Sequence, residues 1–213
     1  MKTSLLFLAL FSVSNLFGQT SGNGVTDIDG NFYETVTIGT QVWMSKNLDV
    51  ATFRNGDSIP QVQTNEEWKK AGENKQPAWC YYENDPANGA KYGKLYNWYA
   101  VIDPRGLAPM GYHIPSDKEW KKLAKSLGGN KKAGEKMKIQ EEYGTNSSGF
   151  SGLLGGMGTG YDFVWEGGYG FWWSATEANE RQAKLRFLRL SDINLGIEND
   201  YKGFGLSVRC LKD

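Results

Sequence analysis

Two short clusters of oxygen-bearing side chains have the composition of a calcium-binding loop. The first spans residues 27–31 (DIDGN) and is followed by Glu34. Alternating carboxylates and amides of this kind can converge on a hard cation. The order differs from that of an EF-hand, because Gly30 comes too early and Ile38 stands where the twelfth-position glutamate belongs. An Asx turn that leads into a hairpin is therefore the favoured interpretation of this cluster.

The second cluster consists of Glu83, Asn84, Asp85 and Asn88. These four residues are the candidate calcium ligands of the chain, and calcium is the one candidate cofactor. A proline follows Asp85 and a glycine follows Asn88, so the same residues also have strong turn chemistry. Both interpretations remain open from the sequence.

Catalytic constellations are weakly represented. The chain has 1 His and 2 Cys, which excludes a Cys-rich or His-rich zinc site. His113 precedes a proline and a helix cap, and no nucleophile or carboxylate is identifiable as its partner, so a structural histidine is favoured. The 24 acidic residues give no identifiable pair for glycoside hydrolysis. We therefore expect no catalytic residue and no enzymatic activity.

The two cysteines, Cys80 and Cys210, are expected to form one intramolecular disulfide if the chain is exported to an oxidising compartment. Two buried free thiols are the alternative.

Exposed aromatic residues are the strongest indication of binding. Residues 149–170 contain nine glycines with aromatic residues between them, a composition typical of tightly turned loops. Loops carry function more often than the scaffold does. The candidate ligand-binding residues are Tyr161, Asp162, Trp165, Glu166 and Tyr169. In contrast, we expect the core to contain four other aromatic residues: Trp43, Trp98, Trp120 and Trp173.

The organisation of the chain begins with a predicted export signal. Residues 1–18 have one lysine and a short apolar run, as in a secretory signal peptide, and residues 19–26 form a polar, glycine-rich lead-in. Residues 27–213 are the expected domain. The apolar run is too short to span a bilayer comfortably, so we expect no transmembrane anchor after signal cleavage. With 24 basic and 24 acidic residues, no nucleic acid partner is expected.

Periodicity within the domain predicts short strands and two short helices. Residues 32–38 and 41–44 form a hairpin around Gly39 and Thr40, and further strands are expected at 171–175, 184–190 and 203–212. Capping boxes begin helices at Thr64 and Ser116; the first ends near residues 71–72 and the second runs from Asp117 to about Leu127.

Several aromatic-rich strings together resemble the Fibrobacter succinogenes major paralogous domain. They occur in that family's order: 29–48 (DGNFYETVTIGTQVWMSKNL), 92–100 (YGKLYNWYA), 111–120 (GYHIPSDKEW), 148–150 (SGF), 172–174 (WWS) and 207–210 (SVRC). Many members have a cysteine where this chain has Ala108, which leaves the pairing of any family disulfide open here.

A more distant likeness links residues 114–120 (IPSDKEW) and 203–209 (GFGLSVR) to the formylglycine-generating enzymes, whose fold is related to C-type lectins. That chemistry needs two closely spaced cysteines near the C-terminus, and only Cys210 is present there. The resemblance therefore implies the fold and not the catalysis.

These resemblances imply a C-type-lectin-like, sulfatase-modifying-factor-like α+β domain with several short antiparallel strands and long loops. They also imply a bacterial protein that is secreted, periplasmic or attached to the cell surface. The expected function is an exported, non-catalytic binding or surface-interaction module, with a glycan or a cell-envelope protein as its partner. The alternatives are a divergent secreted enzyme, either a hydrolase or a formylglycine-generating-type oxidase, and a purely structural surface protein.

Overall fold

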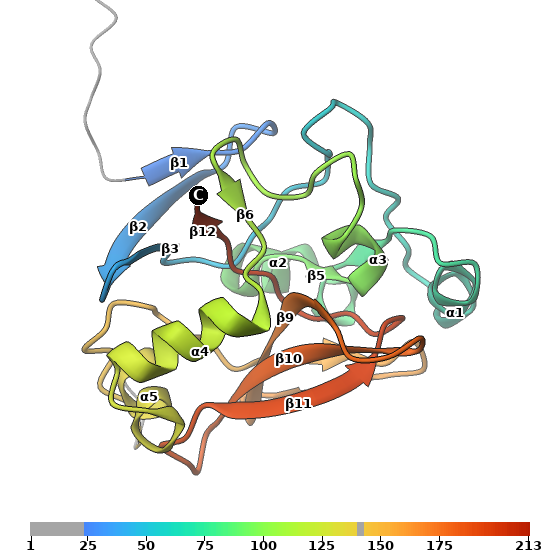
Figure 1. Cartoon of the computed structure of the whole chain (residues 1–213). Helices are drawn as coiled ribbons and strands as arrows, with labels where there is room; N and C mark the ends of the chain where they lie inside the picture. Colours follow the sequence, from blue (N-terminus) through green and yellow to red (C-terminus); the bar gives the residue numbers. More distant parts are fainter. Residues whose placement is uncertain (1–23, 140–142) are drawn as a thin grey trace, which may run out of the picture.

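The computed structural model describes residues 24–139 and 143–213, arranged as a mixed α+β domain (Figure 1). The predicted signal peptide, residues 1–18, lies outside the described residues. Two five-stranded sheets and one two-stranded sheet form the β part. The longest described helix has 10 residues, and no described helix has the length and apolarity that crossing a membrane requires.

The first sheet is antiparallel throughout and contains the predicted hairpin. Its strands, in spatial order, are β1 (Gly24–Thr26), β2 (Phe32–Ile38), β3 (Gln41–Met44), β12 (Leu211–Lys212) and β6 (Tyr112–His113). Ile38 pairs directly with Gln41, which confirms the two-residue turn at Gly39 and Thr40. Residues 24–26 were expected to belong to the flexible lead-in, but they pair with β2 because its outer edge offers free backbone groups.

The second sheet contains the longer strands. In spatial order they are β11 (Gly196–Tyr201), β10 (Gln182–Arg189), β9 (Tyr169–Glu177), β7 (Gly155–Gly158) and β8 (Phe163–Glu166). All neighbours are antiparallel except β7 and β9, which are parallel. The third sheet pairs β4 (Trp79–Cys80) with β5 (Leu95–Tyr96).

Five α-helices are described, where the sequence predicted two. Both predicted capping boxes are present, at the start of α1 (Asn65–Glu73) and α4 (Asp117–Ser126). The unpredicted elements are α2 (Pro86–Tyr92), α3 (Trp98–Val101), α5 (Asn130–Met137) and the 3₁₀ turn η1 (Tyr82–Asn84). Two of them lack strong sequence signals, because α3 is a single turn and α5 has no side-chain cap, whereas α2 begins with an Asp85 cap and Pro86.

The core is divided among three clusters. The largest lies between the sheets, the second surrounds α4, and the third surrounds α1. Figure 1 shows α4 crossing between the β2–β3 hairpin and strands β10 and β11. All four tryptophans that were expected in the core are buried there: Trp43, Trp98, Trp120 and Trp173.

The C-terminal segment, residues 203–212, was expected to be one amphipathic strand. Only Leu211–Lys212 form a regular strand, and the polar residues Ser207 and Arg209 are as buried as their apolar neighbours. The reason is that this segment passes between the sheets and bonds to each in turn. Leu206 pairs with Tyr96 of β5, and Ser207 accepts a backbone hydrogen bond from Trp173 of β9.

Arg209 fixes this segment through a side chain that is completely buried. Its guanidinium donates to Asn47 Oδ1 at 2.7 Å and to the carbonyl oxygens of Met44 and Phe150. Asn47 Oδ1 also accepts from Trp172 Nε1 at 2.8 Å. Burial lowers the pKa of Arg209 to about 9, so the carbonyl dipoles and the amide oxygen must stabilise its charge.

The predicted disulfide between Cys80 and Cys210 is wrong. Both residues are free thiols in the structure, buried in different clusters: Cys80 packs around α1 and Cys210 between the sheets. Burial raises the pKa of each thiol well above its ordinary value, which keeps both protonated and unreactive.

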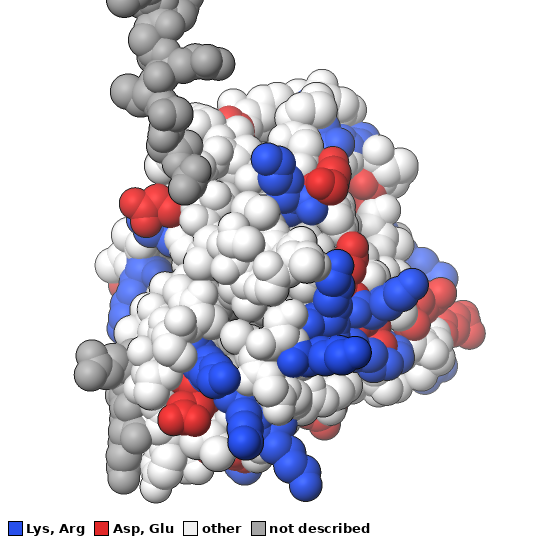
Figure 2. Space-filling view, turned by 60° about the vertical axis from the view of Figure 1, so that its left-hand side comes forward, with Lys and Arg blue, Asp and Glu red and all other residues white. Residues whose placement is uncertain are grey.

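On the face viewed in Figure 2, basic side chains cover more of the surface than acidic ones, although the formal net charge of the chain is zero.

Replacing Asn47 with alanine should lower the free energy of unfolding by about 2–4 kcal/mol, because it leaves the buried Arg209 and Trp172 donors without their acceptor. Urea denaturation would measure this. The control is Asn55→Ala, since Asn55 is exposed and bonds only to Asp57. Equal stability of the two variants would contradict the role given to Asn47.

Iodoacetamide should label neither cysteine in the native protein and both after unfolding without a reductant, because burial protects two free thiols. Intact-mass spectrometry would count the labels. A chain that accepts no label until it is reduced would instead contain the disulfide.

Candidate functional site

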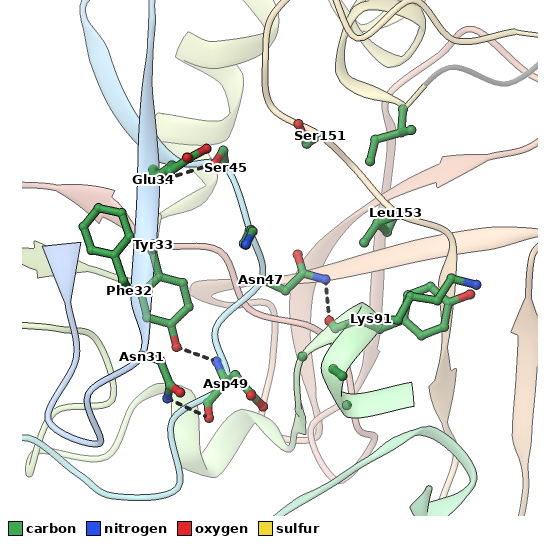
Figure 3. Close-up of a pocket in the computed structure, with 16 residues that line it drawn as sticks. Asn31, Phe32, Tyr33, Glu34, Ser45, Asn47, Asp49, Lys91, Ser151 and Leu153 are labelled. Atoms are coloured by element: carbon green, nitrogen blue, oxygen red, sulfur yellow. Dashed lines mark hydrogen bonds between the residues drawn. The ribbon is translucent and has the colours of Figure 1, made fainter. Parts of the chain in front are cut away.

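A groove of about 490 Å³ lies between the β2–β3 hairpin and α2 (Figure 3). One wall comes from β2 and the segment after β3, the other from α2 and the chain around residues 151–153. The lining residues include Phe32, Tyr33, Glu34, Lys46, Asn47, Asp49, Lys91 and Tyr92. The volume is within the range of about 300–1,000 Å³ that is usual for small-ligand sites.

Asn47 anchors the floor of the groove. Besides accepting from Arg209 and Trp172, it donates through Nδ2 to the carbonyl oxygen of Tyr92 at 2.9 Å and to Ser207 Oγ at 3.2 Å. One amide therefore joins the two walls of the groove to the buried C-terminal segment. This fixes the width of the groove at this point.

Tyr33 and Asp49 form a second fixed polar group. The Tyr33 hydroxyl donates to Asp27 Oδ2 at 2.6 Å and accepts from the backbone N–H of Asp49 at 2.9 Å. Burial is the main reason why the pKa of Tyr33 lies far above its ordinary value. Burial also raises the pKa of Asp49, although Lys94 opposes this from 2.8 Å.

Asp27 has the role that the favoured interpretation of the first oxygen cluster gives it. Its Oδ1 accepts from the backbone N–H groups of Asp29 and Asn31, at 3.0 and 2.9 Å, which closes an Asx turn before β2.

The rim of the groove combines an apolar ring with charges of both signs. Phe32 is 53% exposed. Glu34, Lys46 and Lys91 supply charges, and Lys91 lies 4.5 Å from the centre of the Tyr92 ring. Such a rim suits a neutral polar ligand that has an apolar face.

The candidate binding residues from the glycine-rich region fall into two separate sets. Trp165, Glu166 and Tyr169 lie at the turn between β8 and β9, where the half-exposed Trp165 ring packs 5.5 Å from Tyr169. Glu166 reaches the groove, because its Oε1 accepts from the Tyr92 hydroxyl at 2.7 Å. The structure therefore places one of the five residues in contact with a groove-lining side chain.

Tyr161 and Asp162 lie beside α1 instead. The carbonyl oxygen of Tyr161 accepts from Asn65 Nδ2 at 2.6 Å, and Tyr161 is 69% exposed. Asp162 lines a small cavity together with Asn84.

Three of the four candidate calcium ligands, Asn84, Asp85 and Asn88, cap a helix or hold a loop. Asp85 Oδ1 accepts from Ala87 N at the start of α2, so Asp85 is a helix cap. Asn84 and Asn88 donate to the carbonyl oxygens of Gln63 and Tyr82. Within residues 24–139 and 143–213, no three His, Cys, Asp or Glu side chains are grouped to hold a metal ion, and we propose no calcium site here.

His113, on β6, lies between two carboxylates. Its Nδ1 is 2.7 Å from Asp213 Oδ1 and its Nε2 is 3.0 Å from Glu119 Oε1. Burial disfavours the imidazolium, but the hydrogen bonds to Asp213 and Glu119 outweigh burial, so the pKa of His113 lies above its ordinary value. Both ring nitrogens face carboxylates rather than a hydroxyl or thiol nucleophile.

His113 predicts a pH dependence of stability. The unfolded imidazole titrates at about pH 6.5. Because the folded pKa is higher, the stabilisation is fully present below that pH and is lost as the pH rises through the folded pKa. Wild type should therefore exceed His113→Gln in melting temperature at about pH 5.5, about one unit below that reference pKa, with the difference shrinking at alkaline pH. A constant difference across this range would contradict the assignment.

Sequence reasoning missed the groove itself. Asn47, Asp49 and Lys91 are single polar residues in no catalytic or metal-binding motif, and only the fold brings them together. The available signal was the position of Asn47 near the end of the string at residues 29–48, which resembles the family's opening. No regular helix or strand follows it directly.

Comparison with known proteins supports one assignment. A family model described as the Fibrobacter succinogenes major domain matches residues 36–212. No curated protein and no solved structure matches the chain. Because the family model covers most of the sequence, the chain belongs to the Fibrobacter succinogenes major domain family.

Proposed function

We propose that this protein is an exported, non-catalytic binding module whose groove takes a segment of a glycan. The observation that carries the proposal is the groove between β2–β3 and α2, with its fixed polar floor and its half-exposed Phe32 rim. We further propose that the scaffold is of the C-type-lectin-like type shared with formylglycine-generating enzymes, on the strings at residues 114–120 and 203–209.

A sugar ring has the chemistry that the groove would recognise. Its hydroxyls both donate and accept hydrogen bonds, and its C–H face is apolar. The exposed Phe32 ring borders the groove at β2, where its tip packs on Gly24 of β1, while Glu34 can accept and Lys46 and Lys91 can donate. The lining has two acidic residues, Glu34 and Asp49, and two basic residues, Lys46 and Lys91, which favours a neutral glycan over a strongly charged one.

The state of the buried polar groups supports binding rather than proton transfer. Asp49 is paired with Lys94, and the Tyr33 hydroxyl already has a donor and an acceptor. Groups held in this way keep their positions when a ligand arrives, which reduces the entropy cost of binding.

We base the proposed export of the protein on the predicted signal peptide at residues 1–18. A module exported across the inner membrane would meet glycans in the periplasm, at the cell surface or in the medium.

Phe32→Ala should weaken polysaccharide binding by about tenfold or more, equivalent to about 1.4 kcal/mol, because it removes the only half-exposed ring on the rim. The test is a glycan array and a polysaccharide pull-down on residues 19–213, followed by titration of each hit. Hits would be repeated with and without calcium.

Trp165→Ala is the matched control, since Trp165 is equally exposed and does not line the groove. Loss of binding in Trp165→Ala with full binding in Phe32→Ala would place the site at the turn between β8 and β9 instead. If the wild-type protein bound no glycan on the array, the glycan proposal would be overturned.

A further inference from the structure

A second cavity, of about 290 Å³, lies beside α1 and shares no lining residue with the groove. Three segments form it: α1, the loop before β8, and the turn after β11. The lining residues are Trp68, Lys69, Gly72, Glu73, Thr159, Gly160, Tyr161, Tyr201, Gly203 and Phe204. We call this cavity the α1 cleft.

Aromatic rings with free polar tips line the α1 cleft. Tyr161 is largely exposed, Tyr201 is partly exposed, and the Tyr201 ring stands edge-on to Phe204 at 5.6 Å. On the exposed rim, Lys69 and Glu73 are 3.8 Å apart and form an ion pair. Apolar faces beside hydroxyls and a balanced pair of charges again suit a neutral, polar ring.

Glycine backbones hold the Trp68 indole against the cleft. A Cβ atom at Gly160 would lie 2.8 Å from Trp68 Cδ1 and 3.6 Å from Nε1, and one at Gly205 would lie 2.7 Å from Cζ2. Gly160 also has a φ of +81°, which favours glycine. The nitrogen end of the indole is thus kept next to the loop that borders the cleft.

Trp68 Nε1 is a buried donor that makes no hydrogen bond, in a residue that is only 6% exposed. A buried donor without an acceptor costs free energy, so it needs an explanation. Trp43 and Trp120 also have unpartnered Nε1 atoms, but these rings are completely buried and line neither the groove nor the α1 cleft. Of these three tryptophans, only Trp68 lines a cavity: it borders both the α1 cleft and the small cavity that contains Asp162 and Asn84.

We propose that the α1 cleft is a second sugar subsite, which takes one neutral pyranose ring. The C–H face of the ring would lie against Tyr161 and Tyr201, and a ring substituent oxygen would accept from Trp68 Nε1. The ligand class rests on the proposed function, whereas the location rests on the cleft itself. Two subsites on one chain would strengthen binding to a polymer beyond binding to either end alone.

The experiment follows the indole N–H signals of ¹⁵N-labelled residues 19–213 by NMR. The probes are the methyl pyranosides of glucose, galactose, mannose and N-acetylglucosamine, each titrated to high millimolar concentration. Trp68→Phe assigns the Trp68 signal by its disappearance and keeps an aromatic ring in place.

A saturable shift of the Trp68 signal with at least one probe would support the subsite. The shift should be lost in Tyr161→Ala, which removes a cleft wall at an exposed position, and retained in Phe32→Ala and Trp165→Ala.

Absence of any Trp68 shift with all four probes would overturn the subsite. A shift that survives Tyr161→Ala would overturn it too. The two proposals fail separately: polysaccharide binding that depends on Phe32 without a Trp68 shift would leave only the groove, and a Trp68 shift without an effect of Phe32→Ala would leave only the cleft.

Discussion

The buried charge of Arg209 is the constraint on which the rest of the fold depends. No acidic side chain is among its hydrogen-bond partners; the guanidinium is held by Asn47 Oδ1 and by backbone carbonyl groups from two distant parts of the chain, Met44 and residues 150–151. Such a charge is tolerated only if all of these partners are in place at once. The end of β3, the loop at residues 150–151 and the C-terminal segment therefore have to assemble together.

The same C-terminal segment positions each surface feature described above. Gly203 and Phe204 form part of the α1 cleft, and Ser207 bonds to Asn47 under the groove. Farther along, Asp213 meets His113 beside β12. The surface features are thus parts of one framework, so a change in the buried segment would be felt in all of them.

Local signals in the sequence were enough to predict elements whose stability is local. The β2–β3 hairpin follows from alternation around Gly39, and α1 and α4 follow from their capping boxes at Thr64 and Ser116. In α2, the Asp85-Pro86 pair was interpreted as a turn or as a calcium site, because the same side-chain oxygen that closes a turn also caps a helix.

The C-terminal segment was misjudged, since alternation cannot reveal that both of its faces are covered. Cys80 and Cys210 could not be placed from the sequence, because pairing depends on distance in the fold. For the same reason, the groove and the α1 cleft, which are built from residues far apart in the chain, had no signature beyond the exposed Tyr161.

The long reach of the C-terminal segment also bears on when this protein can fold. Asn47 and Arg209, which bond to each other, are separated by 162 positions. The β2–β3 hairpin meets β12 only when nearly all of the chain has been synthesised, and contacts of such separation form slowly. Most of the polypeptide must therefore emerge from the ribosome before a stable core can close. Until then, the hairpin and the capped helices lack the contacts with the C-terminal segment that join them to the core, such as those of Arg209 with Met44 and Asn47.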